Sequence, residues 1–184
     1  MISTPRLLLR NWQPRDRSPF ATLNADPRVM QYFPSPLTSE ETDLALERIA
    51  AHFERCGFGL WAAEIRATGE FAGFIGLSVP GFQTHFTPCV EIGWRVAARF
   101  WNQGLATEGA LEVLRYGLGP LCLKEIVSFT AEENRPSRRV MEKIEMTRDP
   151  RDDFDHPGIA EGHPLRRHVL YRMRRAANES PRRA

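Results

Sequence analysis

The hydrophobic period of this chain changes at Gly57. Before Gly57, apolar side chains recur at helical spacing from Leu44 to Phe53, behind Thr38 or Ser39, either of which can cap a helix. A glycine at the end of such a segment is typical of a helix C-terminus. After Gly57, short apolar segments are bounded by glycine and proline, which is typical of strands. The chain therefore combines a long helix with a sheet that follows it.

The order of the expected elements narrows the fold class. Strands are expected at 7–10, 60–65, 72–79, 89–96, 125–131 and 169–173, further helices at 104–118 and 136–144, and shorter helices beginning near Asp16 and Asp26-Pro27. The second and third strands form a hairpin around Thr68-Gly69-Glu70, and the later part runs strand, helix, strand, helix. This order predicts an α+β, or mixed α/β, fold with a parallel pair in its second half.

Composition limits the class of protein. A chain of 184 residues that is 42% hydrophobic and 26% charged has the length of one domain and enough apolar surface for a core. It has no apolar run of 18 residues, no signal-peptide pattern at its start and three widely spaced cysteines. We therefore expect a cytoplasmic protein without a membrane partner.

The charge is small but unevenly spread. The net charge of +2 is too low for a general nucleic-acid binder, yet residues 165–184 carry a net +6 and the remainder −4. We interpret this end as solvated, with an anion-binding tail as the alternative. We expect one domain at 1–175, an arginine-rich tail at 176–184 and no nucleic-acid partner.

The segment from Val90 to Glu108 carries the most chemistry. A strand leads into a loop that contains Gly104 and Ala106, and the loop leads directly into a helix. Small residues let backbone N–H groups approach a ligand, and a helix start adds unpaired N–H donors and a positive dipole end. Such a loop binds phosphate or pyrophosphate. It lacks the Gly-Lys-Ser/Thr of nucleotide-triphosphate loops and the three spaced glycines of dinucleotide-binding folds.

Four motifs, which lie in chain order at 4–10, 90–94, 101–108 and 134–143, together resemble the GCN5-related N-acetyltransferase (GNAT) superfamily. The loop Trp101-x-x-Gly104-x-Ala106-Thr107-Glu108 resembles the pyrophosphate loop of that family, with Trp101 in place of the usual Gln or Arg. Tryptophan followed by Ala-Thr-Glu is typical of the subgroup similar to ribosomal-protein N-terminal (RimJ/RimL-like) acetyltransferases. The other matches are 4–10, 90–94 and 134–143, so the resemblance covers about residues 4–174.

The resemblance implies a fold, a co-substrate and a set of binding residues. The fold is a mostly antiparallel, twisted sheet with one parallel pair splayed around acetyl-CoA and helices on its flanks. Backbone N–H groups of the loop would hold the pyrophosphate, and the strand beside Glu91 would lie along the pantetheine and polarise the thioester. The implied cofactor-binding residues are Ile92, Gly93, Trp94, Trp101, Asn102, Gln103, Gly104, Leu105, Ala106, Thr107, Asn134 and Ser137. No metal is expected.

Glu91 and Ser137 are the candidate catalytic residues. Strand alternation places Glu91 on the same face as Gly93, which leaves space for a linear ligand. A partly desolvated carboxylate there has a raised pKa and can accept a proton from an amine, although a structural pair with Arg95 is the alternative. Ser137 can protonate the departing thiolate or act structurally in a helix first turn. Asn134 can cap that helix as well as contact the coenzyme.

Two segments leave alternatives open. Asp153-Phe154-Asp155-His156 has the residue types of a metal site but lacks a second clustered histidine, so capping or substrate contact is favoured. Glu145 stands where the family has a helix-ending glycine. Because a left-handed glutamate costs about 1 kcal/mol relative to glycine, we expect a turn of different shape.

These observations predict an acetyl-CoA-dependent N-acetyltransferase. Its acceptor would be a primary amine, either a protein N-terminus or a small molecule, attacking the thioester directly without a covalent enzyme intermediate. The alternative is a non-catalytic acyl-CoA-binding or regulatory module on the same fold. The sequence does not select the acceptor, and a homodimer is only a family expectation.

Overall fold

The computed structural model describes residues 1–175, and within them nine strands form one sheet. The strands are β1 (Ile2–Ser3), β2 (Leu7–Arg10), β3 (Leu60–Ile65), β4 (Phe71–Ser78), β5 (Glu91–Val96), β6 (Glu125–Ala131), β7 (Thr147–Arg148), β8 (Phe154–Asp155) and β9 (Arg167–Arg174). The helices are α1 (Arg17–Ala25), α2 (Pro27–Met30), α3 (Ser39–Cys56), α4 (Leu105–Leu118) and α5 (Arg135–Lys143). The tail expected at 176–184 lies outside the described residues, and the single domain expected at 1–175 stays a prediction.

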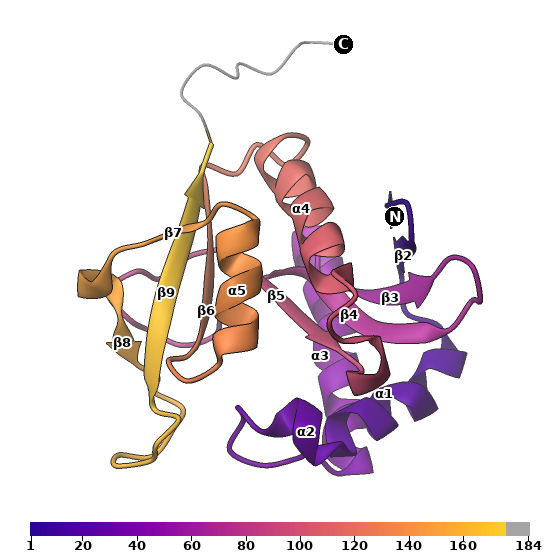
Figure 1. Cartoon of the computed structure of the whole chain (residues 1–184), viewed down its shortest axis with the longest axis horizontal. Coiled ribbons are helices and arrows are strands. Elements are labelled where there is room, and N and C mark those ends of the chain that lie inside the picture. Colours follow the sequence, from indigo (N-terminus) through magenta and orange to yellow (C-terminus); the bar gives the residue numbers. More distant parts are fainter. Residues whose placement is uncertain (176–184) are drawn as a thin grey trace.

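The sheet runs in the order β1-β2-β3-β4-β5-β6-β9-β7, with β8 paired to β9. Every pair is antiparallel except β5 with β6, so the predicted mixed fold with one parallel pair is confirmed. Helices cover both faces of the sheet (Figure 1): α4 and α5 lie in front of it in this view, and α1 and α3 lie behind. None of the helices in residues 1–175 is long and apolar enough to cross a membrane.

The long helix has both of its predicted ends. The Thr38 hydroxyl accepts from the Glu41 N–H at 3.2 Å, and the Glu41 carboxylate accepts from the Thr38 N–H at 2.8 Å. This reciprocal pair provides acceptors for two N–H groups that have no hydrogen-bond partner within the helix. At the other end Gly57 has φ 73°, a left-handed conformation that glycine adopts at little cost. A short helix does begin after Asp16, but the Asp16 carboxylate binds the Arg10 guanidinium and does not cap α1.

The two faces of the sheet bury different side chains. Ile75 and Ile92 pack with Val113 of α4 on one face. Phe20 of α1 packs against Phe74 on the other face, with ring centroids 6.1 Å apart. Burying aliphatic or aromatic side chains of this size contributes about 1.5–3 kcal/mol each. The packing fixes β4 and β5 between the two helical layers.

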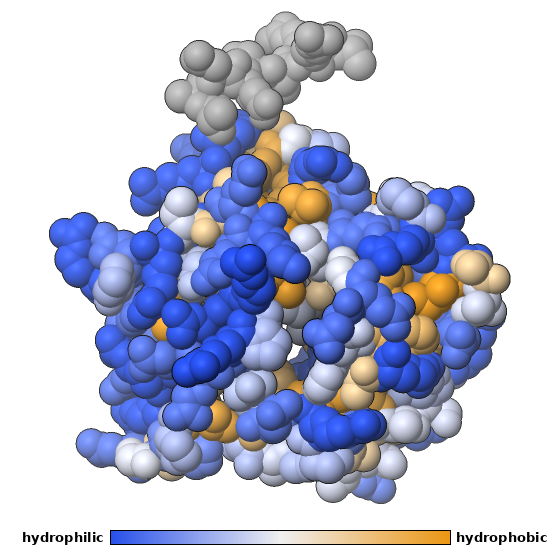
Figure 2. Space-filling view, viewed as in Figure 1, coloured by the Kyte–Doolittle hydropathy of each residue, from blue (hydrophilic) through white to orange (hydrophobic). Residues whose placement is uncertain are grey.

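The strands β5 and β6 share very little backbone pairing. Their register has one Cα pair, Glu91 with Val127, and the Ser128 hydroxyl donates to the Ile92 carbonyl at 2.9 Å. Beyond this point neither strand continues the ladder, so the sheet opens between them. In the view of Figure 1 the surface is hollowed beside α5 (Figure 2).

The turn after α5 corrects one expectation. Glu145 has φ 62°, which is the left-handed conformation of the family's glycine, so the turn keeps that shape despite the substitution. The turn is held by backbone bonds on both sides, from the Glu145 N–H to the Glu142 carbonyl and from the Met146 N–H to the Met141 carbonyl. Ile144 and Met146 are buried beside it. Packing therefore holds the glutamate in a strained backbone conformation.

Candidate active site

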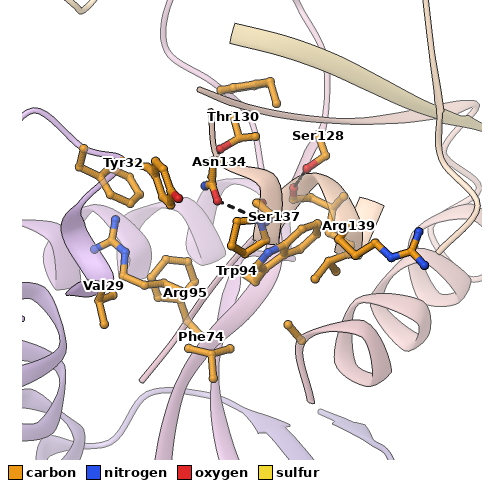
Figure 3. Close-up of a pocket in the computed structure, with 18 of the residues that line it drawn as sticks. Val29, Tyr32, Phe74, Trp94, Arg95, Ser128, Thr130, Asn134, Ser137 and Arg139 are labelled. Atoms are coloured by element: carbon orange, nitrogen blue, oxygen red, sulfur yellow. Dashed lines mark hydrogen bonds between the residues drawn. The ribbon is translucent and has the colours of Figure 1, made fainter. Parts of the chain in front are cut away.

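A pocket of about 880 Å³ lies where β5 and β6 separate. It is lined from β5, β6, the start of α5 and the segment after α2, as the close-up shows (Figure 3), and also from the loop before α4. It collects these residues expected from the sequence: Glu91, Ile92, Gly93, Trp94, Trp101, Asn102, Gly104, Leu105, Ala106, Thr107, Asn134 and Ser137. Gln103 alone of the expected set does not line it.

The loop before α4 presents unpaired backbone donors. From Asn102 to Thr107, no backbone N–H makes a hydrogen bond to any residue that the structure describes. Asn102 and Gly104 have φ 59° and 78°, so the chain turns tightly before the 14-residue helix α4 begins. The N–H groups and the positive end of the helix dipole form an anion site of the kind that binds phosphate.

The side chains of Trp101 and Gln103 fix the shape of this loop. The Trp101 indole donates to the Val96 carbonyl at 2.7 Å. The Gln103 side-chain amide donates to the Arg99 carbonyl at 3.1 Å, and the Gln103 backbone carbonyl accepts from the Arg6 guanidinium at 2.8 Å. Both side chains therefore turn back onto the protein, and only the backbone N–H of Gln103 is left to meet a ligand.

Glu108 ties this loop to the beginning of the chain. Its carboxylate accepts from the Thr4 hydroxyl at 2.6 Å, the Arg6 N–H at 2.8 Å and the Arg6 guanidinium at 2.6 Å. Burial is the largest influence on this carboxyl and raises its pKa, but the Thr4 and Arg6 hydrogen bonds together hold the pKa below its usual range. The Thr-Pro-Arg and Ala-Thr-Glu motifs thus meet in one network.

Glu91 lies on the pocket face of β5 with Gly93, as predicted. A Cβ built on Gly93 would meet only Glu91 Oε1, at 3.8 Å, so the glycine leaves open space. Burial raises the pKa of Glu91 to about 8, against a weak opposing hydrogen bond from the Ser78 hydroxyl at 3.4 Å. Among the described residues no cation lies within 4.0 Å of this carboxylate, so the alternative pairing with Arg95 is wrong.

Asn134 and Ser137 meet at the start of α5. The Asn134 side-chain oxygen accepts from the Ser137 N–H at 3.2 Å, so Asn134 caps the helix. Its amide nitrogen donates to the Thr130 hydroxyl at 2.8 Å. Figure 3 shows both residues at the pocket, next to Trp94. The cap and a place in the pocket coexist, and the Ser137 hydroxyl makes no hydrogen bond among residues 1–175.

Two histidines line the pocket and were not predicted as a pair. The rings of His156 and His168 are 5.0 Å apart, and both lie near Phe129. Burial lowers the pKa of His168 to about 4 and also lowers that of His156, so both rings are neutral at pH 7. The two histidines are separated in the sequence, so the sequence did not predict that their rings are close. It predicted only that the segment containing His156 could contact the substrate.

The aspartates beside His156 do not converge on a metal. Asp153 pairs with Arg148 and accepts from the Leu170 N–H at 3.3 Å, whereas Asp155 pairs with Arg167. In the part of the chain that the structure describes, no group of His, Cys, Asp and Glu is arranged to hold a metal ion. The polar residues of this segment therefore act in ion pairs and in the pocket wall.

The fold and this pocket agree with the comparisons to known proteins. A family model described as Acetyltransferase (GNAT) domain matches residues 6–147. The uncharacterized protein YkkB of Bacillus subtilis (strain 168) is 34% identical over 146 residues, which cover 79% of this chain and 84% of YkkB. The crystal structure of a GNAT-family acetyltransferase from Bacillus anthracis has a TM-score of 0.77 and 26% identity, with 95% of this chain and 98% of that chain covered.

Two further proteins have named activities. The FsC-acetyl coenzyme A-N(2)-transacetylase of Aspergillus fumigatus is 35% identical over 158 residues, covering 76% of this chain but only 63% of that enzyme. RimL, the ribosomal L7/L12 α-N-protein acetyltransferase, has a TM-score of 0.75 at 15% identity in its complex with coenzyme A, with coverage of 95% and 96%. At that identity the likeness shows the fold alone.

The chain belongs to the GNAT acetyltransferase family, and it is an acyltransferase. The family uses acetyl-CoA as its acyl donor and amines as its acceptors. The cytoplasmic location, the homodimer and the absence of a nucleic-acid partner stay predictions.

Proposed function

We propose that this protein transfers the acetyl group of acetyl-CoA to a primary amine, with Glu91 as the general base. One observation carries the proposal: residues 102–107 have six consecutive unpaired N–H groups among the described residues, and all of these residues except Gln103 line the same pocket as Glu91. Anion binding and proton acceptance are thereby available at the two ends of one space. The named activity of the fungal transacetylase supports an amine acceptor.

The residues of the loop and of β5 fit the shape of coenzyme A. The N–H groups of residues 102–107 would hold the pyrophosphate, and the open position beside Gly93 would admit the narrow pantetheine. Because β6 leaves β5 beyond Glu91, the backbone of β5 is free to bind and orient the ligand in place of a neighbouring strand. The bound coenzyme supplies the activated acetyl thioester.

The proton chemistry follows from the environment of Glu91. An amine attacks a thioester only in its neutral form, so a nearby group must take its proton. With a pKa of about 8, Glu91 is a stronger base than an ordinary carboxylate and is still partly ionised at neutral pH. It accepts the proton as the new C–N bond forms and the C–S bond breaks. The Ser137 hydroxyl, which lines the pocket at the start of α5, would donate a proton to the departing sulfur.

Direct attack by the amine is favoured over a cysteine intermediate. Cys89 lies two residues before Glu91, but burial, reinforced by the Glu91 charge, raises the pKa of its thiol to about 11. A thiol with this pKa stays protonated at neutral pH and is a poor nucleophile. Cys89 also does not line the pocket.

The test has two stages that fail separately. Calorimetry should show acetyl-CoA binding in the micromolar range, which corresponds to about −8 kcal/mol. Release of free coenzyme A should then be measured across a panel of small amines, amino acids and peptides. Absence of both heat and thermal stabilisation with acetyl-CoA would overturn the assignment of the loop. Binding without turnover on any amine would overturn the proposed transfer reaction only.

A further inference from the structure

Arg95 is a cation in the pocket that has no acidic partner among residues 1–175. Its Nη1 donates to the Asn24 side-chain oxygen at 2.5 Å, its buried Nε has no partner, and its Nη2 makes no hydrogen bond to any described residue. Burial lowers the pKa of Arg95 to about 10, which still leaves it protonated at neutral pH. A buried guanidinium of this kind is costly unless an anion completes its hydrogen bonds.

The surroundings hold the guanidinium in one place. Asn24, which is itself fully buried, donates to the Thr42 hydroxyl at 3.1 Å, so its oxygen is fixed toward Arg95. The Phe33 ring lies 4.3 Å from the guanidinium carbon and the Phe74 ring 5.4 Å away. The two aromatic rings and the single hydrogen bond to the Asn24 amide orient the guanidinium but leave other N–H donors free. The geometry is that of a prepared anion site.

The coenzyme phosphates do not account for this cation. Figure 3 shows Arg95 beside Tyr32 and Val29 on one side of the pocket, and Arg139 on the opposite side. The unpaired N–H groups of the pyrophosphate loop already provide an anion site at the start of α4. Arg95 therefore faces the half of the pocket formed by the segment after α2, which remains for the acceptor.

We infer that the acceptor amine carries a carboxylate and that the Arg95 guanidinium binds it. The inference rests on the proposed function and names the chemical class of its substrate. Among the described residues that line the pocket, Glu91 is the only acidic one, and it shares the β5 face with Arg95. The acceptor's amine would lie at Glu91 and its carboxylate at Arg95, so the amine meets its proton acceptor and the carboxylate meets a cation.

The strand sets the distance between the two charges. Glu91 and Arg95 are four residues apart on one strand, which places their Cα atoms about 13 Å apart at roughly 3.3 Å per residue. Side chains that lean toward each other shorten this span, but an amine and carboxylate on the same carbon do not fill it. Longer ω-amino acids and short peptides are therefore favoured over glycine. Diamines are disfavoured because a second ammonium would approach Arg95.

The experiment compares acceptors that differ in one group. Aminohexanoate, hexylamine and diaminohexane should be assayed for kcat/KM with the wild-type protein, together with shorter ω-amino acids and a dipeptide. A charged hydrogen bond to Arg95 should favour aminohexanoate over hexylamine by about tenfold to a hundredfold. Arg95→Met should abolish that preference, Arg95→Lys should keep part of it, and Arg17→Met, an exposed arginine paired with Asp43, should keep all of it.

Two results would overturn the inference: no preference for the carboxylate in the wild type, or an unchanged preference in Arg95→Met. The wild-type comparison needs no variant, so it holds even if Arg95→Met does not fold. If no amine is acetylated at all, the proposed function fails and the anion site is tested separately. Aminohexanoate titrated into the protein with coenzyme A should still bind to the wild type and not to Arg95→Met, and no binding to the wild type would reject the site.

Discussion

Replacing Glu91 by glutamine should slow acetyl transfer about a hundredfold or more while leaving the affinity for acetyl-CoA nearly unchanged. Glutamine has the shape of glutamate but cannot accept a proton at neutral pH, and general base catalysis contributes about 10² to 10⁴-fold. In the proposed function, the loop before α4 binds the coenzyme. Among the described residues, the Glu91 side chain makes no hydrogen bond to that loop. The loss should therefore fall on kcat.

The pKa of about 8 sets the pH dependence of the wild type. At pH 7 roughly one-tenth of Glu91 is ionised, and at pH 9 roughly nine-tenths, so kcat should rise about tenfold over this interval and level off above it. In Glu91→Gln that rise should vanish. Above pH 9, where wild-type kcat has levelled off, the remaining pH dependence of the variant should follow the ionisation of the amine, so the defect narrows there.

The same pKa has a consequence for stability that needs no acceptor. Between the ordinary carboxyl pKa of 4.5 and about 8, the folded protein holds a proton that the unfolded chain has lost. Stability therefore falls as pH rises through this window, at about 1.4 kcal/mol per pH unit, and the penalty for the buried carboxylate reaches roughly 5 kcal/mol as an upper value. Glu91→Gln should not show this fall.

Both effects can be measured on the same three proteins. The kcat profile from pH 6 to 10 (roughly the range over which Glu91 titrates) and denaturant unfolding at each pH would be compared for wild type, Glu91→Gln and Glu54→Gln, whose carboxylate is exposed on α3. Glu54→Gln should match the wild type in both. A Glu91→Gln protein with wild-type kcat at every pH would remove Glu91 from the chemistry, and backbone positioning of a neutral amine would then explain the transfer.

Three smaller changes test other parts of the structure. Gly93→Val should lower acetyl-CoA affinity at least tenfold without lowering the melting temperature, because its side chain enters only the pocket; Gly81→Val, in an exposed loop with open space around it, is the matched control, and calorimetry decides. Position 93 is a cleaner choice than Gly104, where φ 78° would also strain a valine. Glu145→Gly should raise the free energy of unfolding by about 1 kcal/mol in denaturant titrations, since φ 62° suits glycine; an unchanged value would show that the turn carries no strain. Ser137→Ala should lower kcat less than Glu91→Gln does, because water can also protonate the thiolate. A larger loss in Ser137→Ala would mean that Ser137 contributes more to kcat than Glu91.

Local signals in the sequence predicted the regular elements well. The bounds of β2, β3 and β6 agree with the expected ranges, and α3 begins and ends at its cap residues. The strands β1, β7 and β8 were not predicted, because two-residue strands are too short for a period to be seen. Their pairing is decided by the neighbouring strand and not by their own residues.

The coenzyme side of the pocket could be predicted and the acceptor side could not. The loop before α4 is contiguous, so its glycine and helix start reveal an anion site directly. Arg95 and Asn24 are 71 residues apart, and His156 reaches His168 only because β8 pairs with β9. No spacing rule connects residues brought together by the sheet, so a charged group without a partner becomes visible only in three dimensions.

The place of β9 in the sheet has a consequence for how the protein is made. This strand pairs with β6 and β7 on its two sides, yet it lies beyond residue 147, where the family match ends. While the chain is being synthesised, β6 keeps an open edge, rich in apolar residues, until residue 174 has emerged. Exposed edges of this kind invite pairing with other chains. A fragment that ends at the boundary of the matched region should therefore aggregate. The wall of the pocket formed by β6 has its neighbouring strand only after nearly the whole chain has been translated.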